Sequence, residues 1–154
     1  MGSIDGFCIR KCNRYKSELE PIIKLHWEQI ALNKDKIKLN PDWNQYKLLE
    51  DAGILKLYTV RDGTELVGYF CVVMAMGLHY ADHVMAACDV LYVKPDKRAG
   101  LTGYKLIAFV EKELKKLNVS VLAINTKVHA PFDKLMERMN YKCTERLYQK
   151  YIGK

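Results

Sequence analysis

Apolar residues at helical spacing mark two segments in the first third of the chain. Ser17 and Glu20 form a capping box, and Pro21 falls in the first turn of the helix, where its missing N–H costs little. The helix carries one apolar stripe, made of Leu19, Ile22, Ile23, Trp27 and Ile30. A second helix is expected to begin at residues 40–41 and to end at Gly53, since glycine tolerates the left-handed cap conformation.

The middle of the chain changes to the shorter period of β-strands. Residues 55–60 and 66–76 are rich in Val, Tyr, Phe and Leu, and the pair Asp62 and Gly63 between them is a strong hairpin signal. Residues 84–93 predict a third strand of this group. We therefore expect three strands that pair in sequence order.

The remainder of the chain alternates between the two patterns. A helix that opens at Gly103 has one apolar face, made of Leu106, Ile107, Val110, Leu114 and Leu117. Three more strands are expected, over residues 7–12, 119–124 and 144–152. A short helix is expected over residues 131–139. Asn140 is expected to end the short helix in the left-handed conformation.

This order of elements predicts an α/β fold in a single domain over residues 1–154. We expect a mixed sheet of about six to seven strands, flanked by about four helices. The crossover from residues 84–93 through a helix to residues 119–124 should be parallel and right-handed. At 154 residues, the chain is too short to bury a second core.

Composition and charge narrow the class of protein. The chain has 49% hydrophobic and 28% charged residues, as folded globular chains do, and no apolar run approaches the roughly 20 residues that cross a bilayer. No secretory signal opens the chain, and Gly6 stands where a myristoylation motif has Ser or Thr, so we expect a cytoplasmic protein with no membrane partner. The net charge is +7, and the basic residues are scattered through the chain without a long Lys/Arg block. This pattern favours a solvated surface with one phosphate site over dedicated nucleic-acid binding.

The cysteines indicate a reducing compartment. They are odd in number and lack any Cys-x-x-Cys pair, so we interpret them as buried thiols: Cys8, Cys12, Cys71, Cys88 and Cys143. Strand alternation places Cys88 and its neighbour Asp89 on opposite faces of the sheet, so only one of them can face a given cleft. A covalent cysteine intermediate is therefore disfavoured.

The turn between residues 84–93 and the helix at Gly103 carries the clearest chemistry. A strand ends in small residues that lead directly into a helix, and such a turn presents free N–H groups beside the positive end of the helix dipole. Gly100 and Gly103 allow close backbone approach, while Lys97 and Arg98 add positive charge, as a phosphate site requires. From the spacing alone, an ordinary flexible loop explains the segment equally well.

The same segment resembles the signature of the GNAT acyl-CoA N-acyltransferases, Val-x-Pro-x-x-Arg-x-x-Gly-x-Gly-x-x-Leu. The matching residues are Val93, Pro95, Arg98, Gly103 and Leu106. Leu101 replaces the first glycine of the signature, next to Gly100. The order of elements, together with residues 66–69, extends the resemblance over nearly the whole chain. Three short stretches are similar to acetyltransferase-like proteins of tailed bacteriophages, which would place the protein in the host cytoplasm: residues 25–28, 77–80 and 148–151.

This resemblance implies an N-acetyltransferase that uses acetyl-CoA as co-substrate and an amine of unidentified class as acceptor, in a ternary complex. By position, one strand end would pair with the pantetheine arm through the backbone of Leu91, Tyr92 and Val93. The following turn would wrap the pyrophosphate with Arg98, Ala99, Gly100, Leu101, Thr102, Gly103 and Tyr104. His129 falls where the family has an Asn near CoA, and dimers are common in the superfamily, so a homodimer is a further expectation.

Candidate catalytic residues follow from the need to deprotonate an amine. Asp89 lies in an apolar strand, where a carboxylate that faces a cleft would have a raised pKa and would serve as the base; the alternative is a structural Asp. His79 and Tyr80 lie on the loop that would shape the acceptor site. Met136 occupies the position of the usual acid Tyr, so the acid would be Tyr148, Tyr80 or water, unless no acid is needed.

Other polar residues receive simpler interpretations. His79, Asp82 and His83 do not complete a metal site, so we predict no metal. His26 lies on an apolar stripe and is interpreted as a core histidine with its hydrogen bonds satisfied. Two alternative functions stay open: an acyl-CoA-binding or protein-interaction module without chemistry, indicated by Leu101 and Met136, and a GNAT-like enzyme that modifies nucleic acid, indicated by a pI of about 9.1.

Overall fold

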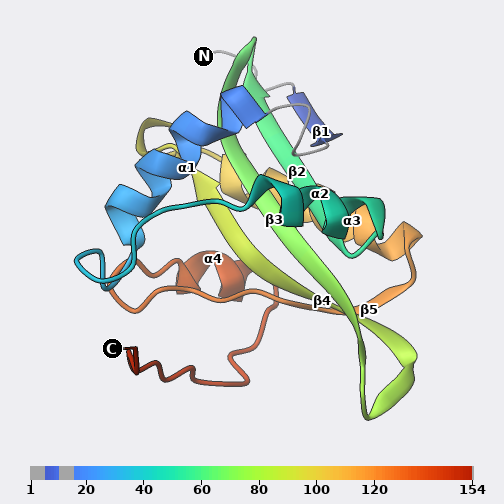
Figure 1. Cartoon of the computed structure of the whole chain (residues 1–154). Helices are drawn as coiled ribbons and strands as arrows, with labels where there is room; N and C mark the ends of the chain where they lie inside the picture. Colours follow the sequence, from blue (N-terminus) through green and yellow to red (C-terminus); the bar gives the residue numbers. More distant parts are fainter. Residues whose placement is uncertain (1–5, 11–15, 154) are drawn as a thin grey trace.

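One mixed sheet organises the chain, and its strands lie in sequence order from β1 to β5 (Figure 1). The computed structural model describes residues 6–10 and 16–153. The strands are β1 (Gly6–Arg10), β2 (Leu55–Asp62), β3 (Glu65–Gly77), β4 (Tyr80–Val93) and β5 (Val119–Ala123). Neighbours from β1 to β4 are antiparallel, and β4 and β5 are parallel, which confirms the predicted parallel crossover.

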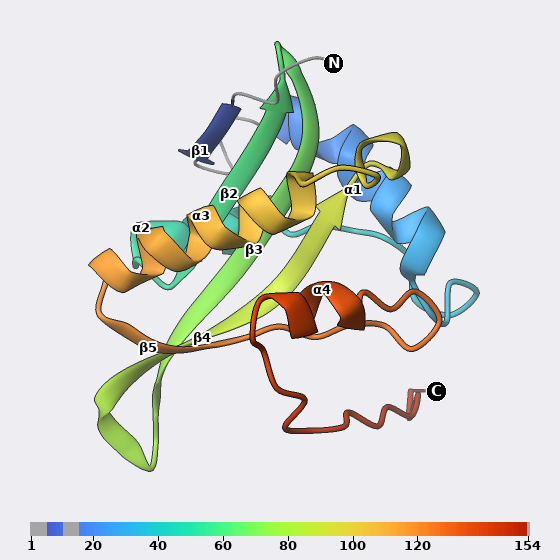
Figure 2. The same ribbon diagram turned by 180° about the vertical axis from the view of Figure 1, so that it is seen from behind.

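Helices cover both faces of this sheet (Figures 1 and 2). They are α1 (Lys16–Ile30), α2 (Trp43–Asp51), α3 (Thr102–Lys116) and α4 (Asp133–Arg138), with a 3₁₀ turn, η2 (Pro95–Lys97), before α3. Buried residues of α1 pack with those of the central strands into one core, and buried residues of α3 and α4 pack into another on the opposite face. The structure is thus a single α/β domain. None of the described helices is long and apolar enough to cross a membrane.

Three turn and cap signals of the sequence correspond to observed geometry, whereas Ser17, the expected cap of the first helix, lies inside α1, which begins at Lys16. Gly53, Gly63 and Asn140 have positive φ angles of 74°, 58° and 62°, and Asp62 pairs with Glu65 across the two-residue hairpin turn. The second helix begins slightly later than predicted. It starts at Trp43 because Asp42 caps it, accepting a hydrogen bond of 3.0 Å from the Gln45 N–H.

The predicted strand count was wrong. The described residues form five strands instead of six to seven, because residues 144–152 pair with no described strand. They run past α4 as an extended segment (Figures 1 and 2), and Leu147, Tyr148 and Ile152 are 73%, 85% and 88% exposed. An apolar, alternating sequence makes a strand only where a free sheet edge meets it.

The cysteines in the sheet are buried, whereas the one beside the unpaired C-terminal segment is exposed. Cys71 and Cys88 are buried in the sheet, as predicted, whereas Cys143 is exposed at the start of the segment that joins no strand. Its predicted burial was therefore wrong. Cys12, at the predicted end of the first strand, lies outside the described residues.

Gly68 is the glycine of the described sheet that leaves the least room for a side chain, and its replacement should destabilise the fold. A Cβ atom there would lie 2.8 Å from the Tyr92 carbonyl oxygen and 2.9 Å from Val60 Cγ1. Because the backbone atom cannot move aside cheaply, Gly68→Ala should cost about 1–3 kcal/mol of unfolding free energy. Urea unfolding measures this, with Gly100→Ala as control, since nothing lies within 4 Å of a Cβ at that position. Equal stability of the two variants would contradict the close packing.

Candidate functional site

The parallel strands β4 and β5 separate towards the end of β4. They pair only between Val84–Ala87 and Val119–Ala123, and β4 then continues to Val93 without β5 beside it. From Cys88 to Val93, the edge of β4 that faces away from β3 therefore has no partner among the described strands. Backbone N–H and C=O groups along such an edge are available to an extended ligand, except the Val93 carbonyl oxygen, which accepts a hydrogen bond from Arg98.

A β-bulge at Asp89 accompanies this separation. In the register with β3, Cys71 pairs with Val90 and Val72 pairs with Cys88, which leaves Asp89 as the extra residue. Bulges bend a strand and turn side chains in a new direction, and they occur often beside functional sites. The Asp89 side chain is exposed at this bend.

The beginning of α3 lies directly after β4 and η2 and has no side-chain cap. Leu101 occupies the cap position and offers no acceptor, so the first N–H groups of the helix point out unbonded by any cap. Thr102 is 1% exposed, and its buried hydroxyl has no hydrogen-bond partner. A buried, unpartnered hydroxyl beside uncapped N–H groups is the donor set that a phosphate group satisfies.

The glycine positions of this turn leave room for a ligand. A Cβ at Gly100 would meet nothing within 4 Å, and one at Gly103 would meet only Leu135 Cδ2, at 3.5 Å. Leu101 replaces a glycine of the resembling signature, but its φ of −91° suits any residue, and its side chain is exposed. The departure at Leu101 therefore imposes no strain on the turn. Ala99, Leu101 and Tyr104 all lie exposed around it.

The two basic side chains of the turn are held away from it. Lys97 Nζ lies 2.9 Å from a carboxylate oxygen of Asp62. Arg98 folds back over the end of β4, where its Nε donates to the Val93 carbonyl oxygen at 2.7 Å and its Nη2 donates to Gln29 Oε1 at 3.1 Å. Its guanidinium lies 5.3 Å from the Tyr92 ring centroid. In this structure the Arg98 side chain thus joins the end of β4 to Gln29 of α1. Its predicted contact with a pyrophosphate stays a prediction.

Beside Arg98 lies a buried polar cluster that the sequence analysis did not identify as part of a site. His26 is 5% exposed, its Nδ1 lies 2.7 Å from the Tyr69 hydroxyl oxygen, and its ring stacks on Tyr92 at 4.7 Å. The interpretation of His26 as a satisfied core histidine is confirmed. The Tyr92 hydroxyl is buried with no hydrogen-bond partner. A sequence signal for this cluster is weak, because only the β3–β4 register places Tyr69 opposite Tyr92.

The environment of His26 predicts a pH-dependent loss of stability. Burial, followed by the charges of Arg98 and Lys127, lowers the pKa of His26 to about 4. The unfolded chain has the ordinary pKa of about 6.5 and binds this proton more readily, so stability is complete above pH 6.5 and falls as the pH drops towards 4. We expect a loss of about 3 kcal/mol from this residue.

Chemical denaturation between pH 7 and pH 4 measures this loss, with His26→Gln as the matched variant. Glutamine retains a hydrogen-bonding partner for Tyr69 but does not titrate in this range. The wild-type chain should therefore lose more stability than the variant over this interval. Parallel pH profiles would show that His26 is not held neutral.

Asp89 and Cys88 differ in their capacity for proton transfer. Burial raises the pKa of the Asp89 carboxyl above its usual value, although the side chain reaches solvent. Burial, and then the charge of Asp89, raises the pKa of the Cys88 thiol to about 12, and Cys88 packs in the core on the α3 side. Burial raises the pKa of Tyr69 as well, with a smaller contribution from Asp89. Asp89 is therefore the exposed titratable group of this pair, whereas the Cys88 thiol is buried and stays protonated at neutral pH.

Solved structures share this arrangement of elements over nearly the whole chain. A ribosomal-protein-alanine N-acetyltransferase from Brucella melitensis biovar Abortus 2308 has a TM-score of 0.73 at 19% identity, and the match covers 96% of this chain and 99% of that one. An aminoglycoside acetyltransferase from an uncultured soil metagenomic sample has a TM-score of 0.76 at 13% identity, covering 98% and 99%. A GNAT family acetyltransferase of Staphylococcus aureus subsp. aureus USA300_TCH1516 has a TM-score of 0.69 at 15% identity, covering 96% and 98%.

The chain has the GNAT acetyltransferase fold. No family model matches the sequence, and no curated protein matches it in sequence either. The likeness therefore rests on three-dimensional structure. In this GNAT fold, the open edge of β4 and the uncapped start of α3 lie next to each other in the chain, joined by η2.

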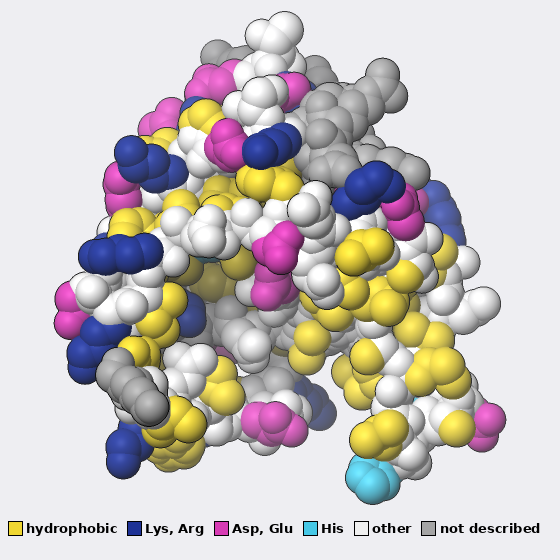
Figure 3. Space-filling view, viewed as in Figure 1, with side chains coloured by type: hydrophobic (Ala, Val, Ile, Leu, Met, Phe, Trp, Pro, Cys, Tyr) yellow, Lys and Arg dark blue, Asp and Glu magenta, His cyan; other side chains and the backbone are white. Residues whose placement is uncertain are grey.

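The hairpin of β3 and β4 carries two predicted catalytic residues away from this site. Gly77 pairs with Tyr80, so that Leu78 and His79 form the turn at the tip, and Leu78 is 98% exposed. The hairpin projects from the body (Figures 1 and 3). Asp89 follows Tyr80 by nine positions on β4, which corresponds to about 30 Å in an extended strand. His79 and Tyr80 therefore do not meet Asp89 within one copy, because β3 and β4 continue beyond their neighbours in the sheet.

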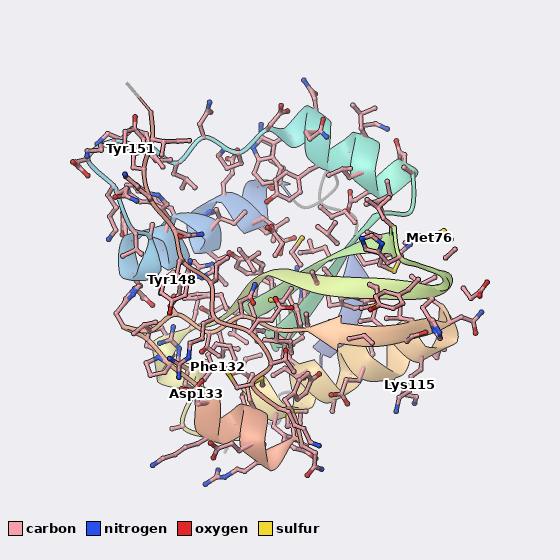
Figure 4. All side chains as sticks on the ribbon, turned by 90° about the horizontal axis from the view of Figure 1, so that it is seen from below. Met76, Lys115, Phe132, Asp133, Tyr148 and Tyr151 are labelled. Carbon is pink, nitrogen blue, oxygen red and sulfur yellow. The ribbon has the colours of Figure 1, made fainter. Side chains whose placement is uncertain are left out.

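The structure also gives the environment of the remaining residues that the sequence analysis discussed. Tyr148 lies exposed on the C-terminal segment (Figure 4). His129 Nε2 lies 3.2 Å from the Ile30 carbonyl oxygen and ties the loop after β5 to the end of α1. Met136 is 8% exposed within the core on the α3 side, so no acid side chain stands there. His83 Nδ1 lies 2.9 Å from Ser120 Oγ, and no three His, Cys, Asp or Glu residues within residues 6–10 and 16–153 gather as metal ligands.

A hollow marks the face that α1 and α2 cover. Figure 3 shows it below these two helices and above the C-terminal segment, with the β3–β4 hairpin to one side. The side chains of Tyr69 and Tyr92 belong to the core on this face, and Asp89 acts electrostatically on Tyr69.

Proposed function

We propose that the chain is an N-acetyltransferase that moves an acetyl group from acetyl-CoA to an amine. The observation that carries this proposal is the uncapped start of α3, with the buried and unpartnered Thr102 hydroxyl, next to the open edge of β4. The GNAT fold supports acetyl transfer, since solved structures with this fold include a ribosomal-protein-alanine N-acetyltransferase and an aminoglycoside acetyltransferase. Their acceptors differ, so the fold does not select the amine.

The residues at the turn fit a diphosphate. The N–H groups of Thr102, Gly103 and Tyr104 and the Thr102 hydroxyl supply donors, and the positive end of the α3 dipole favours negative charge. The open edge from Leu91 to Val93 would take the amide groups of the pantetheine arm. Bound acetyl-CoA supplies a thioester whose carbonyl carbon accepts the amine nitrogen, with cleavage of the carbon–sulfur bond.

Asp89 is the proposed base. An alkyl amine carries a proton at neutral pH, because its pKa is about 10.4, and it must lose that proton before it can attack. Asp89 reaches solvent at the bulge, and its raised pKa makes it a better proton acceptor than an ordinary carboxylate. We assign no acid side chain, because Met136 is a core residue and a thiolate leaves without strong assistance.

Two measurements on the wild-type chain test this function. Calorimetric titration should show saturable binding of acetyl-CoA, and a thiol-release assay with a panel of small amines, peptides and aminoglycosides should show release that depends on one of these acceptors. No binding would contradict the proposal. Binding without release against the whole panel would favour the second candidate, an acyl-CoA-binding module, for which the buried Met136 is the observation.

A further inference from the structure

We propose that one surface of the chain, where the loop after α1, the loop after β5 and the C-terminal end meet, binds single-stranded nucleic acid. This surface, the lysine surface, consists of residues 31–42, 124–132 and 148–153. Its lysines contact phosphate groups, and its aromatic rings stack with bases. The proposal adds a binding partner and does not depend on acetyl transfer.

The fold brings together three segments that are far apart in the sequence. His129 Nε2 lies 3.2 Å from the Ile30 carbonyl oxygen, which holds the loop after β5 against the end of α1. Lys36 Nζ lies 5.0 Å from the centroid of the Tyr151 ring, which places the C-terminal end beside the loop after α1. Figures 1 and 2 both show these loops and the C-terminal end on the same side of the molecule. Lysines that are scattered in the sequence are therefore neighbours in the structure.

The lysines of this surface are not neutralised by carboxylates. Five lysines lie in the three segments: Lys34, Lys36, Lys38, Lys127 and Lys150. None of them forms an ion pair within residues 6–10 and 16–153, whereas five lysines elsewhere each do: Lys16, Lys47, Lys94, Lys97 and Lys116. Asp35 and Asp42 are the two carboxylates of the three segments, and Asp42 caps α2. The lysine surface therefore carries excess positive charge.

Two of these lysines are positioned by the backbone. Lys34 Nζ donates to the Glu28 carbonyl oxygen, and Lys38 Nζ donates to the Lys34 carbonyl oxygen at 2.8 Å. A carbonyl oxygen orients an ammonium group without cancelling its charge, and each ammonium group has three donors. Both side chains therefore keep donors for a phosphate group.

Aromatic side chains lie among the lysines. Lys34 Nζ lies 5.6 Å from the centroid of the half-buried Trp27 ring. Tyr148 is 85% exposed, and Figure 4 shows Tyr148 and Tyr151 on the side of the molecule where α1 lies. Positive charge combined with aromatic rings on which bases stack is typical of proteins that bind single strands. This combination favours a single strand over an acidic peptide, which has no bases, and over a duplex, whose bases stack on one another.

Fluorescence anisotropy with labelled single-stranded oligonucleotides of about 16 nucleotides, one of RNA and one of DNA, measures this binding. For a single strand, the logarithm of the association constant falls with the logarithm of the salt concentration by about 0.7 for each neutralised phosphate. Contacts from all five lysines would give a slope of about −3.5. Saturable binding of either oligonucleotide with a slope steeper than about −2 supports the proposal, and the tighter ligand identifies the preferred sugar.

Two triple variants with the same change in net charge locate the binding. Replacement of Lys34, Lys36 and Lys127 by Gln should weaken binding about 100-fold at about 0.1 M salt, because each lost contact costs about 5-fold there, and should flatten the slope by about 2. Replacement of Lys16, Lys47 and Lys116 by Gln removes lysines that are exposed and paired with carboxylates, and it should leave affinity and slope nearly unchanged. Thermal unfolding shows that each variant is folded.

Stacking and the start of α3 have separate variants. Tyr148→Ala should weaken binding at least about 5-fold through the loss of one stacked base. Gly103→Glu places a negative charge at the start of α3 and should leave oligonucleotide binding intact, because that turn lies outside the three segments. A loss in Gly103→Glu as large as that in the Lys34, Lys36 and Lys127 variant would assign the binding to the start of α3 and overturn the proposal.

Three other outcomes overturn the proposal. The first is the absence of binding to either oligonucleotide at low salt. The second is an equal loss of affinity in the two triple variants, which would show that only net charge matters. The third is equally tight binding of a duplex or of poly-glutamate, which would show that the surface does not select single strands. None of these measurements uses acetyl-CoA, so their failure leaves the proposed acetyl transfer untouched.

Discussion

Gly103→Glu should abolish the binding of acetyl-CoA while leaving the chain folded. Gly103 is in the first turn of α3, where a new Cβ has room beside Leu135. A carboxylate there interacts favourably with the helix dipole, so the melting temperature should stay the same or rise slightly. The same charge occupies the anion site and repels a diphosphate. We expect binding to weaken at least about 100-fold, which corresponds to about 2.8 kcal/mol.

Gly103→Gln is the control for the size of the side chain. Glutamine has the same shape as glutamate without the charge, so the difference between the two variants measures electrostatics at the start of α3. Calorimetric titration of both variants with acetyl-CoA provides the comparison, and thermal unfolding confirms that each is folded. Equal affinities for the two variants would show that the helix start does not bind the diphosphate.

Asp89→Asn should lower kcat/KM for acetyl transfer by about 10² to 10⁴, the usual contribution of a general base. The amide has nearly the shape of the carboxylate but accepts no proton. The pH profile provides a second readout. Because the base acts in its deprotonated form and the pKa of Asp89 is raised, wild-type kcat/KM should fall as the pH drops through that pKa. The Asn variant should lack this dependence.

Asp82→Asn supplies the matched control on the same strand. Asp82 is an exposed carboxylate on the projecting part of β4, away from the bulge. Its replacement should leave both kcat/KM and the pH profile unchanged. Initial rates of thiol release across the pH range, with saturating acetyl-CoA, measure all three chains. An Asp89→Asn variant with wild-type kcat/KM at every pH would exclude Asp89 as the base.

Local sequence patterns predicted most of the elements of this GNAT fold. The apolar stripe of α3, whose residues from Leu106 to Leu114 are buried, the hairpin at Gly63 and the left-handed cap at Asn140 each depend on residues close together in the chain. Periodicity and turn chemistry act over a few residues, so a single sequence carries them in full. The turn from a strand into the helix that opens near Gly103 could be predicted in the same way, and α3 begins at Thr102. Its role as a phosphate site stays a prediction.

Contacts between residues far apart in the sequence could not be predicted from local patterns. Arg98 pairs with Gln29, 69 positions away, and His26 meets Tyr69 across 43 positions, so neither the withdrawal of Arg98 from the turn nor the buried cluster could be predicted from spacing. The distance between Tyr80 and Asp89 depends on how far β4 continues beyond the neighbouring strands. No local sequence pattern predicts that length.

The C-terminal segment shows most clearly what the sequence determines and what depends on the tertiary structure. The sequence by itself determined that residues 144–152 favour a strand, and it determined most of the elements, the hairpin and the turn from strand to helix before α3. Only the tertiary structure decided that this segment pairs with no strand among the described residues, that β4 leaves β5 beyond Ala87, and that Asp89 is exposed at a bulge. The reason is physical: backbone preference belongs to each residue, whereas pairing and desolvation depend on which other surfaces the whole fold brings alongside.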